Sequence, residues 1–233
     1  MTQAPAKAEA PLTSLAVIIP VLDRRDDLRA TLRALPQVGE VIVVDGGSAD
    51  GSGQVAKSHG AALIATQPSR GTQLRTGAER AAADWLLFLH ADTRLDAAAW
   101  AAIRSTLANG KAARAASFRF ALEDGAWQAR LLELGVRIRV ALLALPYGDQ
   151  GLLIHRSLYE EVGGYRDLPL MEDVDLVRRL GRRRLVRLEG CAVTSAARWR
   201  RRGWARQSLA NLRCLLLYLA GAPIERIART RER

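Results

Sequence analysis

Short apolar runs alternate along the chain with segments in which apolar residues recur every three or four positions. Apolar runs bounded by turn residues predict buried strands, and the longer spacing predicts helices with one buried face. The predicted strands cover residues 15–22, 40–45, 61–66, 84–90, 116–122, 150–155 and 184–190. The predicted helices cover residues 26–35, 52–59, 71–83, 96–110, 127–145, 171–181 and 204–221. This order predicts an α/β fold with a mostly parallel central sheet flanked by helices.

Two aspartates stand at the carboxyl ends of predicted strands. Asp45 ends the run "EVIVVD", and Asp92 follows the apolar run Trp85–Leu89 with His90 just before it. In open α/β sheets ligands bind outside the carboxyl ends of the strands. A carboxylate at that edge avoids the cost of burial if it stays near water, cations or hydrogen-bond donors. We therefore expect both aspartates at a ligand-binding edge.

The loop "VVDGGSADGSG" is rich in glycine but does not match a dinucleotide-binding fingerprint. Its glycines lack the G-x-G-x-x-G spacing, and they follow the second predicted strand, whereas the first is followed by "PVLDRRDD". This order argues against a nicotinamide-dependent enzyme. Two interpretations of Asp45 remain open: the carboxylate binds the base or ribose of a nucleotide, or it caps the helix that follows.

Composition is that of one globular domain with its own core. The 233 residues are 49% apolar and 25% charged, which is ordinary for a globular protein. Cys191 and Cys214 lie far apart without metal-binding spacing, which argues against a disulfide scaffold or structural zinc and fits a reducing cytoplasm. Every apolar run is too short or too interrupted to span a bilayer. We expect a disordered Ala/Pro-rich tail at 1–13 and a cytoplasmic domain at 14–233.

The formal net charge is +11, and much of the excess lies in residues 178–187 and 198–206. A basic surface of this kind could meet phosphates, anionic lipid or nucleic acid, and it could also be a solvated face. Aromatic residues make up 5% of the chain and do not interleave with the arginines as on a base-stacking surface. We therefore expect no specific binding of nucleic acid.

Seven motifs occur in the order seen in family 2 glycosyltransferases with a GT-A fold, and the chain resembles that family from about residue 15 to beyond residue 204. The motifs are "LAVIIPVLDRRDDL", "VIVVDGGSADGS", "RGTQLRTGA", "LLFLHADTRL", "PYGDQGLLI", "LPLMEDVDLVRRL" and "TSAARWRRRG". More narrowly, "HADT", "YGDQG" and "EDVDL" resemble a compact bacterial subfamily without transmembrane helices, some of whose members are assigned to arsenosugar biosynthesis.

The resemblance implies a Rossmann-like GT-A fold and a hexosyltransferase-type activity. It implies inverting, metal-dependent transfer of a sugar from a nucleoside diphosphate sugar to a hydroxyl of a small acceptor. Family frequency favours UDP as the nucleotide. The resemblance also implies a nucleotide-binding half at 14–110, an acceptor and catalytic half at 111–205, and a C-terminal helical segment at 206–233.

A divalent cation, Mg²⁺ or Mn²⁺, would sit on the diphosphate of the donor in this family. Asp92 matches the last carboxylate of the family's D-x-D-type motif and would hold the cation, and hard oxygen ligands suit Mg²⁺. His90 stands where an aspartate is more common. Two interpretations of His90 stay open, since it could bind Mn²⁺ or the ribose, or it could be a hydrogen-bonded residue at a strand end.

The motif "MEDVDL" matches the family's catalytic pair. Asp173 would take the proton of the acceptor hydroxyl as general base, a role worth roughly 10²–10⁴-fold in rate. Glu172 would orient Asp173 or help to bind the acceptor. Asp175 falls on another side of the predicted helix and is expected to be a cap or a surface charge. The alternative for Asp173 is a helix N-terminal carboxylate favoured by the helix dipole.

Other matched positions surround the donor. By resemblance, the nucleotide-binding residues are Pro20, Asp45, Arg70, Gln73, Arg198 and Trp199. Asp149 and Gln150 of "YGDQG" would lie near the donor sugar or the acceptor. Arg75 replaces an asparagine that is frequent in the subfamily, so it either alters a donor contact or points to solvent.

Two further interpretations concern partners. The chain could be a peripheral sugar transferase acting on a polyprenyl phosphate or other lipid, with the basic segments and the helix at 204–219 docking on the anionic inner membrane surface. That helix could instead pack on its own domain or on a second copy of the chain. An inactive relative is the third alternative, to which the unusual His90 gives some support.

Overall fold

The computed structural model describes residues 12–110, 112–224 and 226–228. The tail expected at 1–13 therefore lies largely outside the described residues. Leu12 and Thr13, which that prediction included, form the start of the first strand. The last residues of the predicted C-terminal segment, 229–233, also lie outside the description.

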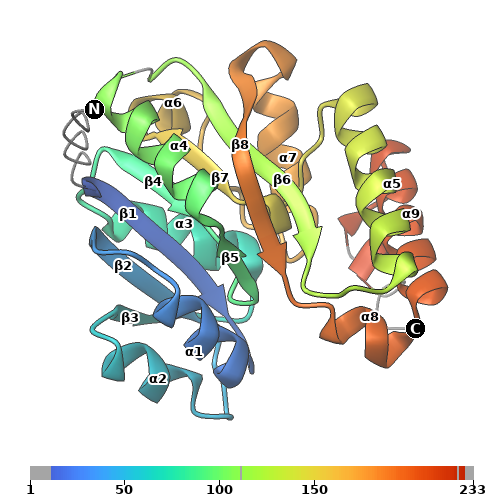
Figure 1. Ribbon diagram of the computed structural model, residues 1–233, viewed down its shortest axis with the longest axis horizontal. Helices are drawn as coiled ribbons and strands as arrows, with labels where there is room; N and C mark the ends of the chain where they lie inside the picture. The colour runs from blue at the N-terminus through green and yellow to red at the C-terminus, as the bar shows by residue number, and fades with distance from the viewer. Residues whose placement is uncertain (1–11, 111, 225, 229–233) are drawn as a thin grey trace, which may run out of the picture.

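Within the described residues one eight-stranded sheet has the order β3-β2-β1-β4-β7-β6-β8-β5 (Figure 1). Its strands are β1 (Leu12–Val21), β2 (Val38–Asp45), β3 (Ala62–Ala65), β4 (Trp85–Phe88), β5 (Thr93–Leu95), β6 (Ala115–Leu122), β7 (Leu152–His155) and β8 (Leu185–Thr194). The long strands β1, β2 and β6 fall where the apolar runs predict them.

The sheet is mixed and not purely parallel, although six of its eight described strands run in one direction, in line with the prediction of a mostly parallel sheet. Strands β3, β2, β1 and β4 are parallel, but β7 runs antiparallel to both β4 and β6, and β5 runs antiparallel to β8. The run "LLIH" of β7 is buried and apolar, and such a run has the same pattern in either direction. The apolar run therefore predicted where the strand lies but not whether it is parallel or antiparallel to its neighbours.

Helices cover both faces of the sheet (Figure 1). They are α1 (Arg25–Arg33), α2 (Ser52–Ser58), α3 (Arg70–Arg80), α4 (Ala97–Ala108), α5 (Trp127–Leu143), α6 (Arg156–Glu161), α7 (Glu172–Leu180), α8 (Ala197–Arg202) and α9 (Trp204–Leu219), with 3-10 turns η1 (Gly148–Gln150) and η2 (Arg182–Arg184). The sequence-based prediction missed β5, α6 and α8. These elements are too short for their apolar residues to show a strand or helix spacing.

The side chains of β1 contribute to two core clusters, one on each face of the sheet. Val17 and Ile19 belong to a cluster with residues of α1, α2 and α4, whereas Ala16 and Ile18 belong to a cluster with residues of α3, α6 and α7. Successive side chains of a strand point to opposite faces, so an apolar run of this length must be covered on both. Gly77 lets α3 approach closely, since a Cβ there would lie 2.4 Å from Ile18 Cγ2.

The parallel half of the sheet brings the expected functional edge together. Val21 of β1 pairs in register with Asp45 of β2, and Ile18 pairs with Phe88 of β4. The residues that follow β4, including His90 and Asp92, therefore leave the sheet beside the carboxyl ends of β1 and β2. None of the helices in the described part of the chain has the length and apolar character needed to cross a membrane.

Candidate active site

A cleft of about 350 Å³ opens at this edge of the sheet. Nine of the twelve predicted site residues line it: Pro20, Arg70, Gln73, His90, Asp92, Asp149, Asp173, Arg198 and Trp199. Asp45, Glu172 and Gln150 are not among its lining residues. The cleft also takes in residues that the sequence did not indicate: Arg24, Tyr147, Leu170, Met171, Thr194, Asn211 and Cys214.

Asp173 lies in the first turn of α7 and faces the cleft with 8% of its surface exposed. Its Oδ2 accepts a hydrogen bond from Gly148 N at 2.8 Å, and its Oδ1 accepts one from Val174 N at 2.7 Å. The carboxylate is thus both a helix N-terminal acid and a cleft residue, so the two interpretations of Asp173 are compatible. Its two hydrogen bonds fix its direction.

Glu172 is fully buried, with 0% exposure, and is paired with Arg70. Arg70 Nη2 lies 3.4 Å from Glu172 Oε2, and a second contact joins Arg70 Nε to Oε1. Burial raises the pKa of Glu172, although the charge of Arg70 opposes the shift. Burial alone would lower the pKa of Arg70, but Glu172 and Asp173 outweigh it and raise that pKa. Glu172 is therefore placed to hold Arg70 and not to touch an acceptor.

The segment that leads into α7 is fixed against the start of α3. Gly71 N donates to Leu168 O at 3.0 Å, and a Cβ on Gly71 would lie 2.2 Å from Arg166 O. The carboxylate of Asp167 accepts hydrogen bonds from the hydroxyls of Ser69, at 2.9 Å, and Thr72. Glycine is needed at position 71 because the backbone of the segment that leads into α7 occupies the space that a side chain would fill.

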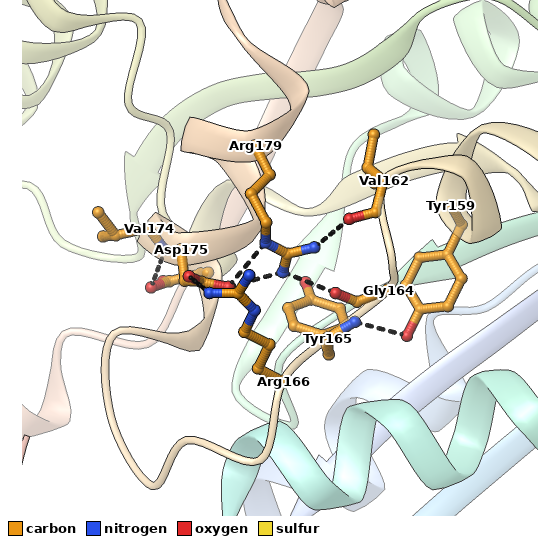
Figure 2. Close-up of polar contacts among 9 residues, drawn as sticks. Tyr159, Val162, Gly164, Tyr165, Arg166, Val174, Asp175 and Arg179 are labelled. Atoms are coloured by element: carbon orange, nitrogen blue, oxygen red, sulfur yellow. Dashed lines mark hydrogen bonds and ion pairs between the residues drawn. The ribbon is translucent and has the colours of Figure 1, made fainter.

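Asp175 anchors the other side of the same segment (Figure 2). It accepts from Arg179 Nη2 at 2.6 Å and from Arg166 Nη1 at 3.3 Å, and Arg179 also donates to Gly164 O at 2.6 Å. The hydroxyl of Tyr159 accepts from Tyr165 N at 2.9 Å. Asp175 is 8% exposed, so the expectation of a cap or surface charge is wrong. Its ion pairs tie α7 to the turn that precedes it.

The surroundings of Asp149 strongly affect its carboxyl group. Burial raises its pKa to about 6, with Asp173 and Asp92 adding to the shift and Arg139 opposing it. Among the described residues, Asp149 Oδ1 is buried without a hydrogen-bond partner. Three carboxylates thus crowd one cleft, and the buried Oδ1 has acceptor capacity left for a cation or donor.

Gln150 supports the cleft from behind. It is 2% exposed, and in the amide orientation that satisfies its neighbours its oxygen accepts from Arg139 Nη2 at 3.2 Å and Tyr147 N at 3.0 Å. The guanidinium of Arg139 lies over the Tyr147 ring, 3.4 Å from its centroid. No sequence signal singled out Arg139, which stands within the apolar run of a long helix.

His90 and Gly148 are in close contact. A Cβ on Gly148 would lie 2.5 Å from His90 Nε2, so the loop carrying Asp149 passes directly over the imidazole. His90 and Asp92 both line the cleft. In the described part of the chain no group of three or more His, Cys, Asp or Glu side chains is arranged as a metal site. A divalent cation here would need oxygens from a ligand or water, which suits Mg²⁺.

Arg24, Arg70 and Arg198 bring positive charge to the lining of the cleft. Burial lowers the pKa of Arg198, the nearby charges of Arg24 and Arg70 act in the same direction, and Asp92 opposes them. Among the described residues Arg198 has no ion-pair partner, whereas Arg24 pairs with Asp27 at 3.2 Å. A half-buried guanidinium without a protein counter-ion favours an anionic ligand. Arg24 could have been found in "DRRDD", directly after the first strand.

Trp199 contributes mainly to packing. It is 6% exposed and lies in a cluster with Phe120, whose ring centroid is 6.3 Å away. Gln73 is similarly structural, since its Nε2 donates to Val21 O at 2.9 Å and Val44 O at 2.8 Å and so joins the ends of β1 and β2. Both residues still present part of their surface to the cleft.

Asp45 organises its own loop. Its Oδ1 accepts from Gly47 N at 3.1 Å, Ser48 N at 2.8 Å and Ser48 Oγ at 2.6 Å. The N-cap of α2 is Gly51, and no side chain caps that helix, so the alternative of Asp45 as a helix cap is wrong. A nucleotide-binding role for Asp45 stays a prediction.

Arg75 does not line the cleft. Its side chain is 42% exposed and lies 3.8 Å from Glu79, one turn along α3. Of the two interpretations given to this substitution, the structure favours a side chain that points to solvent.

A family model described as Glycosyl transferase family 2 matches residues 16–156. No curated protein sequence matches the chain. Among solved structures, glucosyl-3-phosphoglycerate synthase from Mycobacterium tuberculosis, in complex with Mn²⁺, UDP and glucosyl-3-phosphoglycerate, aligns with a TM-score of 0.59 and 19% identity. The alignment covers 90% of this chain and 80% of that chain.

Two other solved structures give similar alignments. A further structure of that synthase, with Mg²⁺ and UDP, has a TM-score of 0.56 and 19% identity over 90% of this chain and 80% of that one. A protein described only as mycobacterial has a TM-score of 0.60 and 20% identity over 94% and 80% of the two chains. Likeness at this identity shows the fold, and it confirms the GT-A-like α/β fold with a mixed sheet.

We expect Asp149→Asn to stabilise the metal-free protein at pH 7.5 by up to about 3 kcal/mol, the value of a shift of roughly two pKa units. The folded-state pKa is raised from 3.8 to about 6, so ionisation of Asp149 increasingly disfavours the folded state as pH rises between these values. Urea unfolding with EDTA at pH 7.5 and pH 4 measures the effect. The gain should shrink toward pH 4, and a destabilised variant at pH 7.5 would contradict the assignment.

Glu172→Gln should destabilise the protein by about 2–4 kcal/mol, because it leaves a largely buried Arg70 without its counter-charge. This loss of stability is smaller than that expected for a fully buried charge, since 25% of the Arg70 side chain is exposed. Glu79→Gln is the matched control, because Glu79 is 66% exposed and should change stability by no more than about 0.5 kcal/mol. Equal effects of the two variants in urea unfolding would show that the buried pair is not a stabilising contact.

Proposed function

Because the chain belongs to glycosyl transferase family 2 and is a glycosyltransferase, we propose that it catalyses inverting, metal-dependent sugar transfer. The donor is a nucleoside diphosphate hexose, with UDP the preferred nucleotide, and the acceptor is the hydroxyl of a small molecule. One observation carries this proposal: a single cleft is lined both by the carboxylates of Asp92, Asp149 and Asp173 and by the guanidinium groups of Arg70 and Arg198.

A metal–diphosphate complex fits the charges of these carboxylates and guanidinium groups. The carboxylate of Asp92 and the imidazole of His90 are ligands that Mg²⁺ or Mn²⁺ accepts, and the buried Oδ1 of Asp149 has acceptor capacity left. When bound, the cation would stabilise the negative charge that grows on the leaving diphosphate. Arg198, without a protein counter-ion among the described residues, is proposed to bind the phosphate oxygens bidentately.

The choice of UDP is supported by the solved relatives. The mycobacterial synthase was crystallised with UDP and Mn²⁺ or Mg²⁺, and also with UDP-glucose. We propose Pro20, Asp45 and Gln73, at the ends of β1 and β2 or beside them, as the nucleotide end of the cleft. Trp199 is proposed to form part of its wall.

Asp173 is the proposed general base. It faces the cleft, and its carboxylate is fixed by Gly148 N and Val174 N, so it can accept a proton from a hydroxyl without first reorienting. Glu172 is proposed to act indirectly, by fixing Arg70 next to Asp173. Asp149 is proposed to contact the donor sugar or the acceptor, and Gln150 to hold Arg139 and Tyr147 behind it.

The narrower resemblance to the compact bacterial subfamily remains part of the proposal. Its support is that "HADT", "YGDQG" and "EDVDL" each contribute a carboxylate to the same cleft, namely Asp92, Asp149 and Asp173. We place the reaction in the cytoplasm. Transfer to a lipid acceptor is the second candidate, favoured by the apolar residues that α5 and α9 expose. A homodimer is the other proposed association.

Calorimetric titration should show binding of UDP that depends on Mn²⁺, with GDP binding at least about tenfold more weakly. Asp92→Ala should abolish the dependence on metal, because the cleft then lacks the carboxylate proposed to hold the cation. Arg75→Ala serves as the control, since it changes an exposed residue outside the cleft. Absence of binding by either nucleotide, in a folded protein with metal present, would favour an inactive relative.

A further inference from the structure

Helices α5 and α9 expose an unusual amount of apolar surface. The most exposed residues are Trp127 at 70%, Leu142 at 69% and Leu209 at 65%. The exposed large apolar residues of the two helices are Trp127, Leu131, Leu134, Ile138, Leu142, Leu143, Leu209, Leu212, Leu216 and Leu219. Contiguous apolar surface of this kind marks an interaction site in a water-soluble fold.

On each helix these residues form one stripe. Positions 127, 131, 134, 138 and 142 of α5 are separated by three or four residues, and so are positions 209, 212, 216 and 219 of α9. Residues at this spacing lie on one face of a helix. The buried residues of α9 are Gln207, Cys214 and Leu215, on another face, so its stripe is not part of the domain's own core.

The two helices belong to one region of the surface. Trp204, at the start of α9, packs in the same apolar cluster as Leu132 and Val136 of α5. Arg200 of α8 donates to Asp124, just before α5, at 2.6 Å. Figure 1 shows α5 and α9 beside each other at the right of the molecule, with α8 below them. We call this region the α5–α9 surface.

Arginines surround the apolar stripes. The exposed charged residues within these two helices, both of which are entirely described, are Arg130, Arg137, Arg206 and Arg213. Glu133 of α5 is mostly covered and pairs with Arg130 at 2.7 Å. Arg182 of η2 donates to Ala141 O near the end of α5 at 3.1 Å, which adds a basic turn at that end. The surface therefore combines apolar stripes with positive charge.

We propose that the α5–α9 surface docks on an anionic lipid bilayer. Leu and Trp on one face with arginines beside them is the composition of helices that lie in a membrane interface, and each arginine gains from anionic lipid. A second copy is the less suitable occupant, because each copy carries a net charge of +11 and would place arginines against arginines. Docking is peripheral, since none of the described helices can span the bilayer.

Docking would place α9 between the cleft and the membrane, with one face of the helix toward each. Asn211 and Cys214 of α9 line the cleft, whereas Leu212 and Leu216 of the same helix are exposed. A lipid-borne acceptor could then enter the cleft from the side of α9, and this consequence alone rests on the proposed function. The docking itself is independent of any sugar transfer, so its test is separate from the nucleotide titration.

The test is co-sedimentation of the full chain with two kinds of vesicle, equimolar phosphatidylglycerol and phosphatidylcholine, or phosphatidylcholine alone. Binding should require phosphatidylglycerol and weaken with salt. Leu212→Ser with Leu216→Ser should lower the partition coefficient at least about tenfold, since each leucine loses its burial in the bilayer. Both leucines are exposed, so thermal unfolding and UDP binding should stay as in wild type.

A charge-matched pair of variants tests the arginines. Arg137→Glu with Arg213→Glu should weaken binding to phosphatidylglycerol vesicles at least about tenfold. Arg33→Glu with Arg80→Glu makes the same change of net charge on exposed positions of α1 and α3 and should stay within about twofold of wild type.

Three results would overturn the proposal. The first is wild-type protein that does not bind phosphatidylglycerol vesicles, and the second is equal loss of binding in the two charge variants. The third is a dimer in sedimentation equilibrium that the Leu212→Ser and Leu216→Ser changes convert to monomer, because the surface would then be occupied by a second copy.

Discussion

The buried ion pair between Arg70 and Glu172 is the contact on which the cleft depends. It joins the first residue of α3 to the first residue of α7, two helices that both contribute residues to the cleft. An isolated charge in either position would be costly, so the two helix starts are stable only when they meet. Asp173 follows Glu172 directly, so the contact that joins the two helices also sets the position of the proposed base. The fixed segment at 166–168 and the ion pairs of Asp175 strengthen the same junction.

Charges of both signs lie close together inside the cleft. The carboxylates of Asp92, Asp149 and Asp173 repel one another, which contributes to the raised pKa of Asp149, while the guanidinium groups of Arg70 and Arg198 line the same cleft. A divalent cation would relieve the first repulsion, and a diphosphate would relieve the second. The protein has therefore placed the charges of its proposed ligand complex in advance, and fixed groups of this kind need no reorganisation when charge develops.

Much of the fold and of the cleft could be predicted from the sequence. The spacing of apolar residues locates the strands and helices, and the motifs indicate which residues line the cleft. Asp92 and Asp173 are at the cleft as expected. The direction of β7 could not be predicted, since a strand buried on both faces has no polar pattern to orient it. The burial of Glu172 depends on Arg70, which is distant in the sequence and meets it only in the folded chain. Arg139 lies near the end of the long helix α5, where it contacts Gln150 and Tyr147. Nothing local in the sequence distinguishes it from a solvent-exposed arginine.

The central claim, inverting transfer with Asp173 as the base, is tested most directly by the anomeric configuration of the product together with the rate of one variant. UDP-glucose, Mn²⁺ and the best acceptor from a panel of small hydroxyl compounds would be followed by proton NMR. The account predicts a β-linked product from the α-linked donor. It also predicts that Asp173→Asn lowers kcat at least about 100-fold while UDP binding is unchanged. An α-linked product, or a variant that keeps most of the wild-type rate, would contradict it.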